Sequence, residues 1–511
     1  MKKEISQLKA GALLSYLQMG LGVIIQLLYT PIMLRLLGAS EYGLYNTVSS
    51  TIAMLSVLSL GFNSSYIRYY AKYKKDNNED SIKKLNGLFL IIFLIIGFVA
   101  LLCGLFLSFN LELVFDKGLT DAEYQTAKIL MLLLTVNLAV SFPMSVFQSI
   151  ISAHERYVFL KLLGMLKNVL SPLVTLPLLL MGYRSIAMVV VTLAVAVITD
   201  VIYLIYSKKK LNVGFVFHDF EKGIFKSLLV FTVFIAMNSI VDQINSNMGK
   251  FLLGRYKGTE VVAVYSVGYT LYHLYMLFST SVSGVFSPRI HKIVNETLDN
   301  IAEQKKRLTE LFVKVGRIQF LILSLVCTGL IFFGRPFIDM WAGEGYGEAY
   351  YVAVLLCVSA TVPLIQNLGL EIQRAQNRHQ FRSCVYIGMA VLNFVSTIFL
   401  SQRYGAVGAS IGTAFSLIVA NGFVMNIFYH KKCHIDIIRF WKNILRQSLG
   451  LVVPVICGIL MNYFFDFNSI IRLIFGVGIY TCIYCLSMWL FGMNAYERSL
   501  ITKSARKMIR R

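Results

Sequence analysis

Charged residues are scarce in this sequence, and acidic residues are the scarcest. Of its 511 residues only 14% are charged, and 26 Asp and Glu stand against 48 Lys and Arg. A chain that is 57% hydrophobic has too few polar side chains to cover a soluble globule of this length. The composition therefore excludes a soluble protein and indicates one that crosses a membrane many times.

Sequence signatures of catalysis and of metal binding are absent as well. The chain has no P-loop, no H-E-x-x-H, no G-x-S-x-G and no dinucleotide-binding glycine motif, so neither ATP hydrolysis nor a familiar hydrolase is encoded. Seven of the eight cysteines lie in apolar runs, which predicts no disulfide framework. Cys482 and Cys485 have C-x-x-C spacing but no further ligands nearby. We therefore predict no enzymatic activity, no metal and no cofactor.

What the sequence does contain is a series of long apolar segments. Fourteen of them have the length of about 20–27 residues that a hydrocarbon core of about 30 Å requires. The first follows a basic N-terminus but shows no small-residue cleavage site, so we expect a retained span rather than a signal peptide. The predicted spans are residues 11–34, 44–67, 87–109, 127–151, 158–181, 185–206, 227–253, 261–286, 311–333, 350–372, 383–401, 406–428, 447–465 and 470–491.

Basic residues alternate between the two sides of the membrane. If the N-terminus is cytoplasmic, 35 Lys and Arg fall in cytoplasmic segments and 8 in outer ones. This asymmetry follows the positive-inside rule, and it predicts a protein of the cell membrane with both termini in the cytoplasm. It also accounts for the net charge of +22, so we expect no nucleic-acid partner.

An internal repeat relates the two halves of the chain. Ala153, Arg156 and Phe159 recur as Ala375, Arg378 and Phe381, all three at one common offset. Two looser sets recur at nearby offsets: Tyr183, Thr192 and Asp200 as Tyr404, Thr413 and Asn421, and Gly38, Glu41 and Tyr45 as Gly254, Glu260 and Tyr265. Six spans is an even number, so the two copies should be parallel repeats related by an axis along the membrane normal.

The predicted fold is an all-α integral membrane protein with two six-helix bundles and two further C-terminal helices. Residues 287–310 have apolar residues at helical spacing, which predicts an amphipathic helix that joins the halves or merely anchors at the interface. The predicted domains are residues 1–206, the linker 207–226, the second bundle 227–430, the added helices 431–492 and a basic cytoplasmic tail 493–511.

The seventh predicted span, residues 227–253, carries an unusual polar stripe. Asp242, Ser246 and Lys250 fall within about 80° of one another on a helix. Because an ionised side chain in hydrocarbon costs about 2.5–3.5 kcal/mol, such groups turn toward water or a partner. We expect this helix to line a central cavity, with simple helix packing as the alternative.

Cations outnumber acids within or close to the other apolar segments. A cavity with this bias would suit an anionic head group, because Arg presents a planar fork to phosphate oxygens and Lys a compact charge. For Arg35, Arg68, Arg317 and Arg374 the alternative is that each reaches the nearest interface from a helix end. The candidate substrate-binding residues are Arg35, Arg68, Lys167, Asp242, Lys250, Arg317, Glu371 and Arg374.

Five stretches carry a family resemblance. Residues 31–45, PIMLRLLGASEYGLY, resemble the first-hairpin motif of the polysaccharide transporter (Wzx-type) flippases, in the multidrug/oligosaccharidyl-lipid/polysaccharide exporter superfamily. Four more tracts are similar to later parts of that family: Gly254 with residues 262–266, then residues 334–343, 372–383 and 404–409. The resemblance implies two six-helix bundles around a central cavity, and a groove near the seventh and last two helices for a polyprenyl tail.

The resemblance also implies a function. We expect a flippase that moves an undecaprenyl-pyrophosphate-linked oligosaccharide across the membrane by alternating access, for cell-surface polysaccharide biosynthesis. Its partners would be the lipid-linked glycan, with a polysaccharide polymerase and export machinery as further candidates, and Na⁺, H⁺ or the membrane potential could supply energy. The alternatives are a drug/cation antiporter of the same superfamily, which would want an acidic cavity, and a membrane-bound glycan polymerase. The outer loops, the longest being 110–126 and 334–349, are short for a polymerase.

Overall fold

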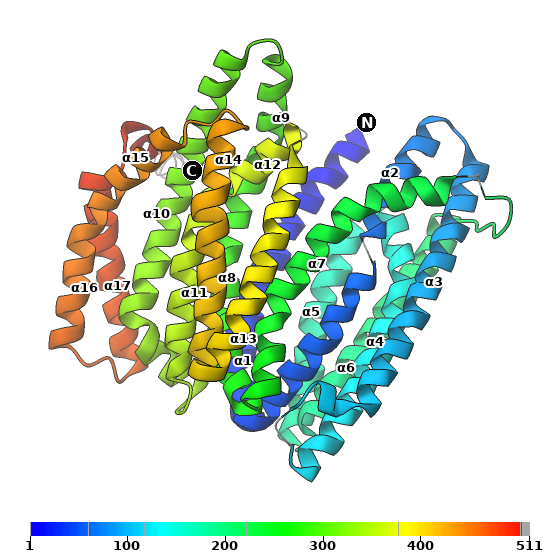
Figure 1. The fold of residues 1–511 in the computed structure, drawn as a ribbon, viewed down its shortest axis with the longest axis horizontal. Coiled ribbons are helices and arrows are strands. Elements are labelled where there is room, and N and C mark those ends of the chain that lie inside the picture. Colours follow the sequence, from blue (N-terminus) through cyan, green and yellow to red (C-terminus); the bar gives the residue numbers. More distant parts are fainter. Residues whose placement is uncertain are drawn as a thin grey trace. The chain divides into compact units, whose positions relative to one another are not determined.

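The computed structural model describes residues 2–59, 61–116, 119–220, 223–376, 378–500 and 502. Within these residues all regular structure is helical (Figure 1), which confirms the predicted all-α class. In the first part of the chain the helices are α1 (Lys2–Met54), η1 (Leu55–Ser59), α2 (Phe62–Lys75), α3 (Glu79–Phe109), η2 (Leu111–Leu113), α4 (Asp121–Ala153), α5 (Tyr157–Leu180), α6 (Arg184–Lys210), α7 (Ile224–Tyr256) and α8 (Thr259–Ser283).

The second part continues in the same way. Its helices are η3 (Gly284–Phe286), α9 (Ser287–Glu296), α10 (Ile301–Ala342), α11 (Glu348–Ile365), α12 (Leu368–Ala375), α13 (His379–Leu417), η4 (Ile418–Val424), α14 (Met425–Lys431), α15 (Ile437–Ser448), η5 (Leu449–Leu451), α16 (Val452–Phe464), α17 (Ile470–Ser487) and η6 (Met488–Gly492). The π-helical turns η4 and η6 interrupt the α-helical pattern twice.

The described residues include 11 helical stretches that are long and apolar enough to cross a membrane. Two of them, Ala10–Lys75 and Gln380–Lys431, each hold two predicted spans. The backbone turns sharply inside both, at Gly38 (φ 78°) and at Gly405 (φ 56°), where only glycine adopts the conformation without strain. If each of these two stretches is counted as two spans and α7 is added, the 11 stretches become the fourteen predicted spans.

Contacts group the described helices into two compact units. One holds the residues up to Ser266 together with Ser401–Gly405, and the other holds Val267–Leu400 with the residues from Ala406 on. By this grouping α7 belongs with the first unit, whereas the repeat in the sequence places residues 227–253 at the start of the second bundle. The predicted domain boundaries themselves stay a prediction.

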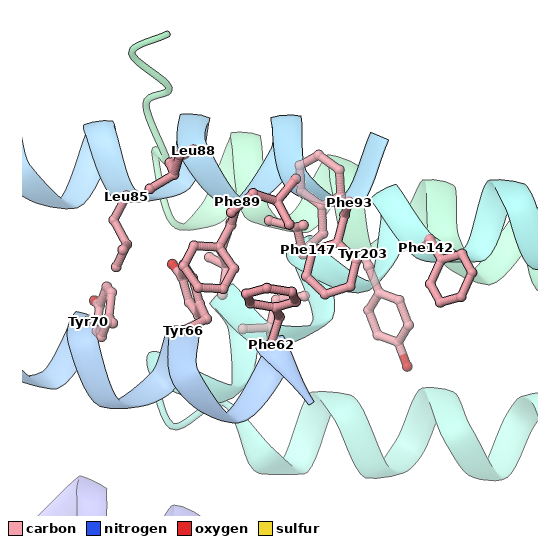
Figure 2. Close-up of a cluster of buried hydrophobic side chains, with 14 of the residues drawn as sticks. Phe62, Tyr66, Tyr70, Leu85, Leu88, Phe89, Phe93, Phe142, Phe147 and Tyr203 are labelled. Atoms are coloured by element: carbon pink, nitrogen blue, oxygen red, sulfur yellow. The ribbon is translucent and has the colours of Figure 1, made fainter. Parts of the chain in front are cut away.

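Aromatic side chains form much of the core of the first unit (Figure 2). Phe62 and Tyr66 of α2 meet Phe89 of α3 edge to face, with ring centroids 6.3 and 5.2 Å apart. The buried Tyr66 hydroxyl donates to Asn86 Oδ1 at 2.7 Å, and the Asn86 amide donates to the Gly214 carbonyl at 2.9 Å. Burying a tyrosine among phenylalanines is tolerated because its polar end keeps a partner.

The break at Gly38 brings four helices together. Ser40 donates to a carboxylate oxygen of Glu123 on α4, and Glu41 accepts hydrogen bonds from the backbone NH and the hydroxyl of Ser185 at 2.8 and 2.6 Å. Glu41 thus caps the start of α6, where backbone NH groups lack helical partners. A Cβ on Gly43 would lie 1.7 Å from the carbonyl oxygen of Thr259 on α8, so α1 and α8 touch through backbone alone.

The first repeated motif folds twice into the same turn. In the turn between α4 and α5 the NH of Arg156 donates to the Ile151 carbonyl at 3.2 Å. In the turn between α12 and α13 the NH of Arg378 donates to the Gln373 carbonyl at 2.8 Å. Donor and acceptor of the second turn are displaced from those of the first by the offset of the sequence repeat, so the backbone repeats along with the sequence.

The second repeated motif also agrees. Arg184 and Gly405 are equivalent positions of the repeat, each directly after its tyrosine, and both have positive φ, at 48° and 56°. About two helical turns later, Thr192 and Thr413 each donate a hydroxyl hydrogen bond to the carbonyl four residues before them, at 2.7 and 3.1 Å. Two local structures that recur at equivalent positions support the predicted duplication.

The segment 287–310 is not the single amphipathic helix that the sequence predicts. Helix α9 ends at Glu296, and α10 begins at Ile301 after a turn in which Asn300 Oδ1 accepts from the Glu303 NH at 3.0 Å. An Asn in this position satisfies a free NH at the helix start and so favours a new helix over continuation of the old one. Residues 287–310 therefore form a helical hairpin.

Two predicted loops are shorter than expected. Helix α10 continues to Ala342 and α11 starts at Glu348, so only a short turn remains of the predicted outer loop 334–349. Residues 437–446 of the basic loop before the predicted thirteenth span lie in α15 (Ile437–Ser448), which Asp436 caps by accepting from the Arg439 NH at 3.0 Å. The basic residues of this loop mask its helical periodicity.

We predict that Gly43→Ala destabilises the protein. The added methyl group would collide with the Thr259 carbonyl, and overpacking of this kind costs about 1–3 kcal/mol. Gly22→Ala is the matched control in the same helix, because a Cβ there meets nothing within 4 Å. Thermal unfolding of the purified protein should show a lower apparent midpoint for Gly43→Ala alone, and equal midpoints for the two variants would contradict the backbone contact.

A second prediction concerns His154, which follows α4. Its Nδ1 lies 2.9 Å from the Ile150 carbonyl and its Nε2 3.0 Å from the Tyr70 hydroxyl. A carbonyl only accepts, so Nδ1 carries the proton and the neutral Nε2 accepts from tyrosine. Burial lowers the pKa of His154 below its ordinary value, so the unfolded state binds the proton more readily.

Stability contributed by neutral His154 is therefore complete above about pH 6.5 and is lost as the pH falls below it. Gln stands at the equivalent position, 376. We expect His154→Gln to reduce the fall in unfolding midpoint between pH 7.5 and 5.5, whereas His430→Gln, at an exposed position, should leave it unchanged. The same pH dependence in wild type and His154→Gln would refute this role.

Candidate functional site

The polar stripe predicted on α7 lies beside a packed apolar face of the same helix. Val241, Leu252 and Leu253 are buried, whereas Asp242 is exposed and Lys250 is partly buried. The Lys250 ammonium makes a long hydrogen bond of 3.5 Å to Asn46 Oδ1 on α1. Lys250 therefore lies where α7 meets α1, and its role in substrate binding stays a prediction.

A second predicted cation faces an acid. Lys167 of α5 is exposed, and its ammonium acts electrostatically on Asp200 of α6. Attraction between opposite charges lowers the cost of placing either one at membrane depth. A ligand of Lys167 would therefore bind within the electrostatic influence of the Asp200 carboxyl group.

A polar cluster in the second unit is not evident from the sequence. Asn421 is the counterpart of Asp200 in the repeat, lies inside the π-helical turn η4 (Ile418–Val424), and accepts from the Tyr386 hydroxyl at 3.3 Å. Arg382 donates to the same hydroxyl at 2.7 Å. The repeat is the signal that could have drawn attention to Asn421. In the sequence, Arg382 resembles any other basic residue of a predicted cytoplasmic loop. The π-helical turns, which often mark functional positions, leave no clear sequence signal.

The structure brings Glu371 and Arg374 into direct contact. Glu371 Oε1 accepts from Arg374 at 2.7 Å, and its Oε2 accepts from the Ser287 hydroxyl at 2.7 Å. Ser287 is the first residue of α9, so Glu371 links α12 to α9. Arg374 is itself exposed and could reach a ligand without breaking the link to α9.

Arg35 and Arg68 lie on two different helices of the first unit. Arg35 lies three residues before Gly38 on α1, and Arg68 lies in the middle of α2; both side chains are exposed. Exposure is what the interfacial alternative predicts for them, since long cationic side chains reach toward water from apolar helices. Their role as substrate ligands stays a prediction.

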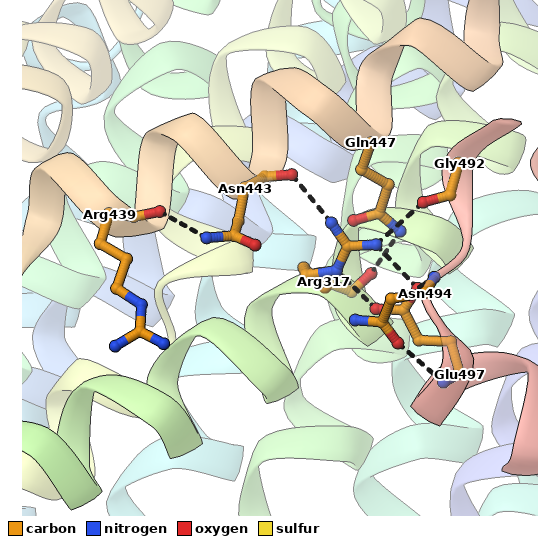
Figure 3. A network of polar contacts seen from close by, with 7 residues as sticks. All are labelled: Arg317, Arg439, Asn443, Gln447, Gly492, Asn494 and Glu497. Atoms are coloured by element: carbon orange, nitrogen blue, oxygen red, sulfur yellow. Dashed lines mark hydrogen bonds and ion pairs between the residues drawn. The ribbon is translucent and has the colours of Figure 1, made fainter.

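Arg317 differs from the other candidates because it is buried among its own partners (Figure 3). Its side chain is 4% exposed, and its Nε and one terminal nitrogen donate to both carboxylate oxygens of Glu497 at 2.6 and 2.8 Å. The guanidinium also donates to the carbonyls of Asn443 and Gly492 at 2.9 and 2.8 Å. These contacts use most of its donors and give Arg317 a structural role.

The network around Arg317 fastens the C-terminal helices. Glu497 is also bound by the backbone NH of Asn494, whose side chain accepts from the Glu497 NH, both at 2.9 Å. This reciprocal capping box starts the helix over residues 495–500. Gln447 of α15 donates to the Arg317 carbonyl at 3.1 Å. One arginine of α10 therefore holds α15 and the segment after α17 together.

The donor chemistry of these clusters suits anions. Across the described residues no three His, Cys, Asp or Glu side chains form a group that could hold a metal ion, and the expected absence of a cofactor stays a prediction. What Lys167, Lys250, Arg374 and Arg382 offer is ammonium and guanidinium N–H donors near apolar helices. Such donors favour phosphate or carboxylate oxygens.

The fold is that of a known class of membrane transporter. A solved structure of the lipid II flippase MurJ in an inward closed conformation superposes with a TM-score of 0.70 over 96% of this chain and 99% of its own, at 16% identity. An inward-facing multidrug resistance MATE family transporter of the MOP superfamily gives 0.62 over 86% and 99%, at 15% identity. A MOP superfamily transporter from Pyrococcus furiosus gives 0.58 over 83% and 96%, also at 15% identity. At such identities the likeness shows the fold alone.

Sequence comparison identifies the family. Residues 8–294 match the family of polysaccharide biosynthesis proteins, and the chain belongs to it. An uncharacterized membrane protein in the cps region of Klebsiella pneumoniae is 23% identical over 290 residues, which are 55% of this chain and 57% of that relative. The match thus spans little more than half of the relative's length. The predicted resemblance is confirmed for the family of polysaccharide biosynthesis proteins, and the fold is the one seen in the MurJ and MATE transporters.

We predict that Glu497→Gln strongly destabilises the protein. Removing one partner leaves a buried, uncompensated arginine charge, which costs about 3–5 kcal/mol. The matched control is Asp80→Asn, because Asp80 pairs with Lys84 at 3.0 Å but is 68% exposed, and such pairs contribute about 0–1 kcal/mol.

Thermal unfolding of both purified variants would measure the difference. Combining Arg317→Met with Glu497→Gln should recover part of the loss, since the unpaired charge is then gone. Similar midpoints for Glu497→Gln and Asp80→Asn would show that the Arg317–Glu497 pair does not stabilise the packing of α10, α15 and the segment after α17.

Proposed function

We propose that this protein is a flippase that moves an undecaprenyl-pyrophosphate-linked oligosaccharide from the cytoplasmic to the outer leaflet of the cell membrane. The observation that carries the proposal is that a chain of the polysaccharide biosynthesis family has a transporter fold over nearly its whole length. Membership of that family supports a glycan as cargo. The basic bias of its helices supports a substrate whose polar end is anionic.

The physical problem for such a substrate is its diphosphate. Its prenyl tail is soluble in hydrocarbon, but moving a multiply charged head group into hydrocarbon costs several kcal/mol per charge. A protein that alternates between two openings can keep the head group in a wet, cationic path while the tail stays in lipid. Positive-inside asymmetry supports a transporter with both termini in the cytoplasm.

The cations in the spans are suited to release as well as to capture. Lys250 already contacts an amide oxygen on Asn46, and Lys167 interacts electrostatically with Asp200. A phosphate must therefore compete with groups of the protein, which keeps binding weak enough for the cargo to leave. Transport needs this balance, since a site that binds too tightly stops turnover. A change in the coupling ion or potential could shift the competition, and we propose that Asp242 on the same helix senses that change.

Among the alternatives, a drug/cation antiporter is supported by the fold, because MATE transporters have the same fold. The low number of acids in the spans disfavours it, since cationic drugs need carboxylates. A membrane-bound glycan polymerase gains less support, because the loop between α10 and α11 is shorter than the sequence indicates. Polymerase and export proteins remain candidate partners of a flippase.

Depletion of the protein in its native cells tests the function directly. We expect lipid-linked glycan units to accumulate on the cytoplasmic leaflet, where only cytoplasmic enzymes or inside-out vesicle probes reach them. Accumulation on the outer leaflet would instead indicate a block in polymerisation and would overturn the flippase proposal.

Within the proposed function we predict that Lys250→Ala and Asp242→Asn lower glycan export while the protein still inserts. Loss of a charge-assisted hydrogen bond of about 1.5–3 kcal/mol corresponds to a fall of about 10–100-fold in the rate. Lys250→Arg keeps the charge and should retain more export than Lys250→Ala. Export assays normalised to membrane protein level provide the measurement, and normal export by both variants would rule out this role for the two residues.

A further inference from the structure

A cavity of about 640 Å³ lies in the α9–α10 hairpin, and its lining includes none of the residues that the proposed transport path uses. Its walls carry four cations, which are Arg289, Lys292, Arg307 and Lys314. The buried side chains of Ile293 and Leu311 form an apolar part of its lining. A pocket with a cationic wall and an apolar part differs from a smooth basic surface, because a ligand can be partly enclosed there.

Helical spacing explains why these cations converge. Arg289 and Lys292 stand three residues apart on α9, and Arg307 and Lys314 stand seven apart on α10. Residues three or seven apart share one face of a helix. Since α9 and α10 are joined by the turn at Asn300, the two cationic faces meet in the hairpin, and this convergence depends on the break that the sequence did not predict.

The charges of the pocket are only partly compensated within the protein. Glu296 accepts from Arg307 at 2.8 Å and lies 3.6 Å from Lys292. The hydrogen bond from Arg307 lowers the pKa of Glu296, so this carboxylate stays ionised at neutral pH. Lys314 is 3.5 Å from the centre of the Tyr496 ring, a contact that attracts the ammonium but leaves its charge in place. Glu310 is the acid in the lining itself, so positive charge remains in excess.

The pocket also lies at a defined depth. Arg289 follows the predicted eighth span by three residues, and Lys314 lies four residues into the predicted ninth. Both positions correspond to the interface between hydrocarbon and water on the predicted cytoplasmic side. Cations at that level attract anionic lipid head groups.

We propose that this pocket binds the phosphate group of a membrane lipid at the predicted cytoplasmic surface. Phosphate is the shared chemistry of two sources, the head group of an anionic phospholipid and the diphosphate of a prenyl carrier. Guanidinium and ammonium donors match phosphate oxygens, and the apolar Ile293 and Leu311 suit the first carbons of a lipid. A phospholipid would make this a regulatory or anchoring site; a carrier would make it a docking site before transport, a reading that rests on the proposed function.

Binding to the full-length protein in detergent tests the proposal. The probes are inorganic pyrophosphate, dioctanoyl phosphatidylglycerol and farnesyl diphosphate, each titrated calorimetrically. Arg289→Gln combined with Lys292→Gln should weaken binding of the probe by at least about tenfold, because both charges line the pocket. The matched control is Lys305→Gln with Lys306→Gln, which removes two exposed charges from α10 outside the pocket and should change affinity by less than twofold.

A substitution of opposite sign sharpens the test. Glu310→Gln removes the carboxylate that repels phosphate and should tighten binding. Equal weakening by the two double variants would show that diffuse surface charge is responsible, and absence of binding by all three probes would also overturn the proposal. Tighter binding of phosphatidylglycerol identifies a phospholipid site, and tighter binding of farnesyl diphosphate identifies a carrier site.

The outcome is separable from that of the proposed function. If the pocket binds phosphatidylglycerol and the depletion experiment shows no defect on the cytoplasmic leaflet, the flippase proposal fails and the lipid site stands. If the protein exports glycan but the pocket variants bind all probes like wild type, the lipid site fails and the flippase proposal stands.

Discussion

The cost of leaving a charge without a partner in hydrocarbon governs this structure. Arg317 is tolerated inside a long apolar helix because Glu497 and two backbone carbonyls surround it. Lys167 has Asp200 nearby, and Lys250 reaches Asn46. Each of these three charges in the spans thus has a neighbour of complementary polarity. The Arg317 guanidinium uses most of its donors in hydrogen bonds within the protein. Within the proposed function, Lys167 and Lys250 would exchange these neighbours for a substrate.

Much of the fold could be predicted from the sequence because the membrane imposes a simple length rule. The fourteen apolar segments and the repeated turns follow from hydropathy and from residues such as Arg156 and Arg378. The two glycine breaks within continuous helices coincide with predicted loops, because Gly38 and Gly405 allow a backbone conformation that other residues avoid. Periodicity and turn chemistry are local signals, and a membrane fold is unusually rich in them.

The candidate site was harder to predict, since its geometry depends on contacts far apart in the chain. Arg317 is a candidate cavity ligand by sequence, because nothing nearby in the chain reveals the acid that pairs with it. That partner lies 180 residues away, in a tail whose most evident feature is its positive charge. The hairpin of α9 and α10 depends on one capping residue, Asn300, whose effect on an amphipathic pattern is easy to overlook. Its break creates the cationic pocket for which we propose a ligand. Charge type was predictable, whereas the partner of each charge was not.

We propose that a transporter fold, in a chain of the polysaccharide biosynthesis family, carries a charged lipid head group across the bilayer. Reconstitution of the purified protein into vesicles that contain a fluorescent prenyl-diphosphate-linked oligosaccharide tests it most directly. An impermeant quencher added outside reports how much of the label is on the outer leaflet. We expect label on the inner leaflet to become quenchable faster with protein than in empty vesicles. Equal rates under each imposed Na⁺, H⁺ and potential gradient would contradict it.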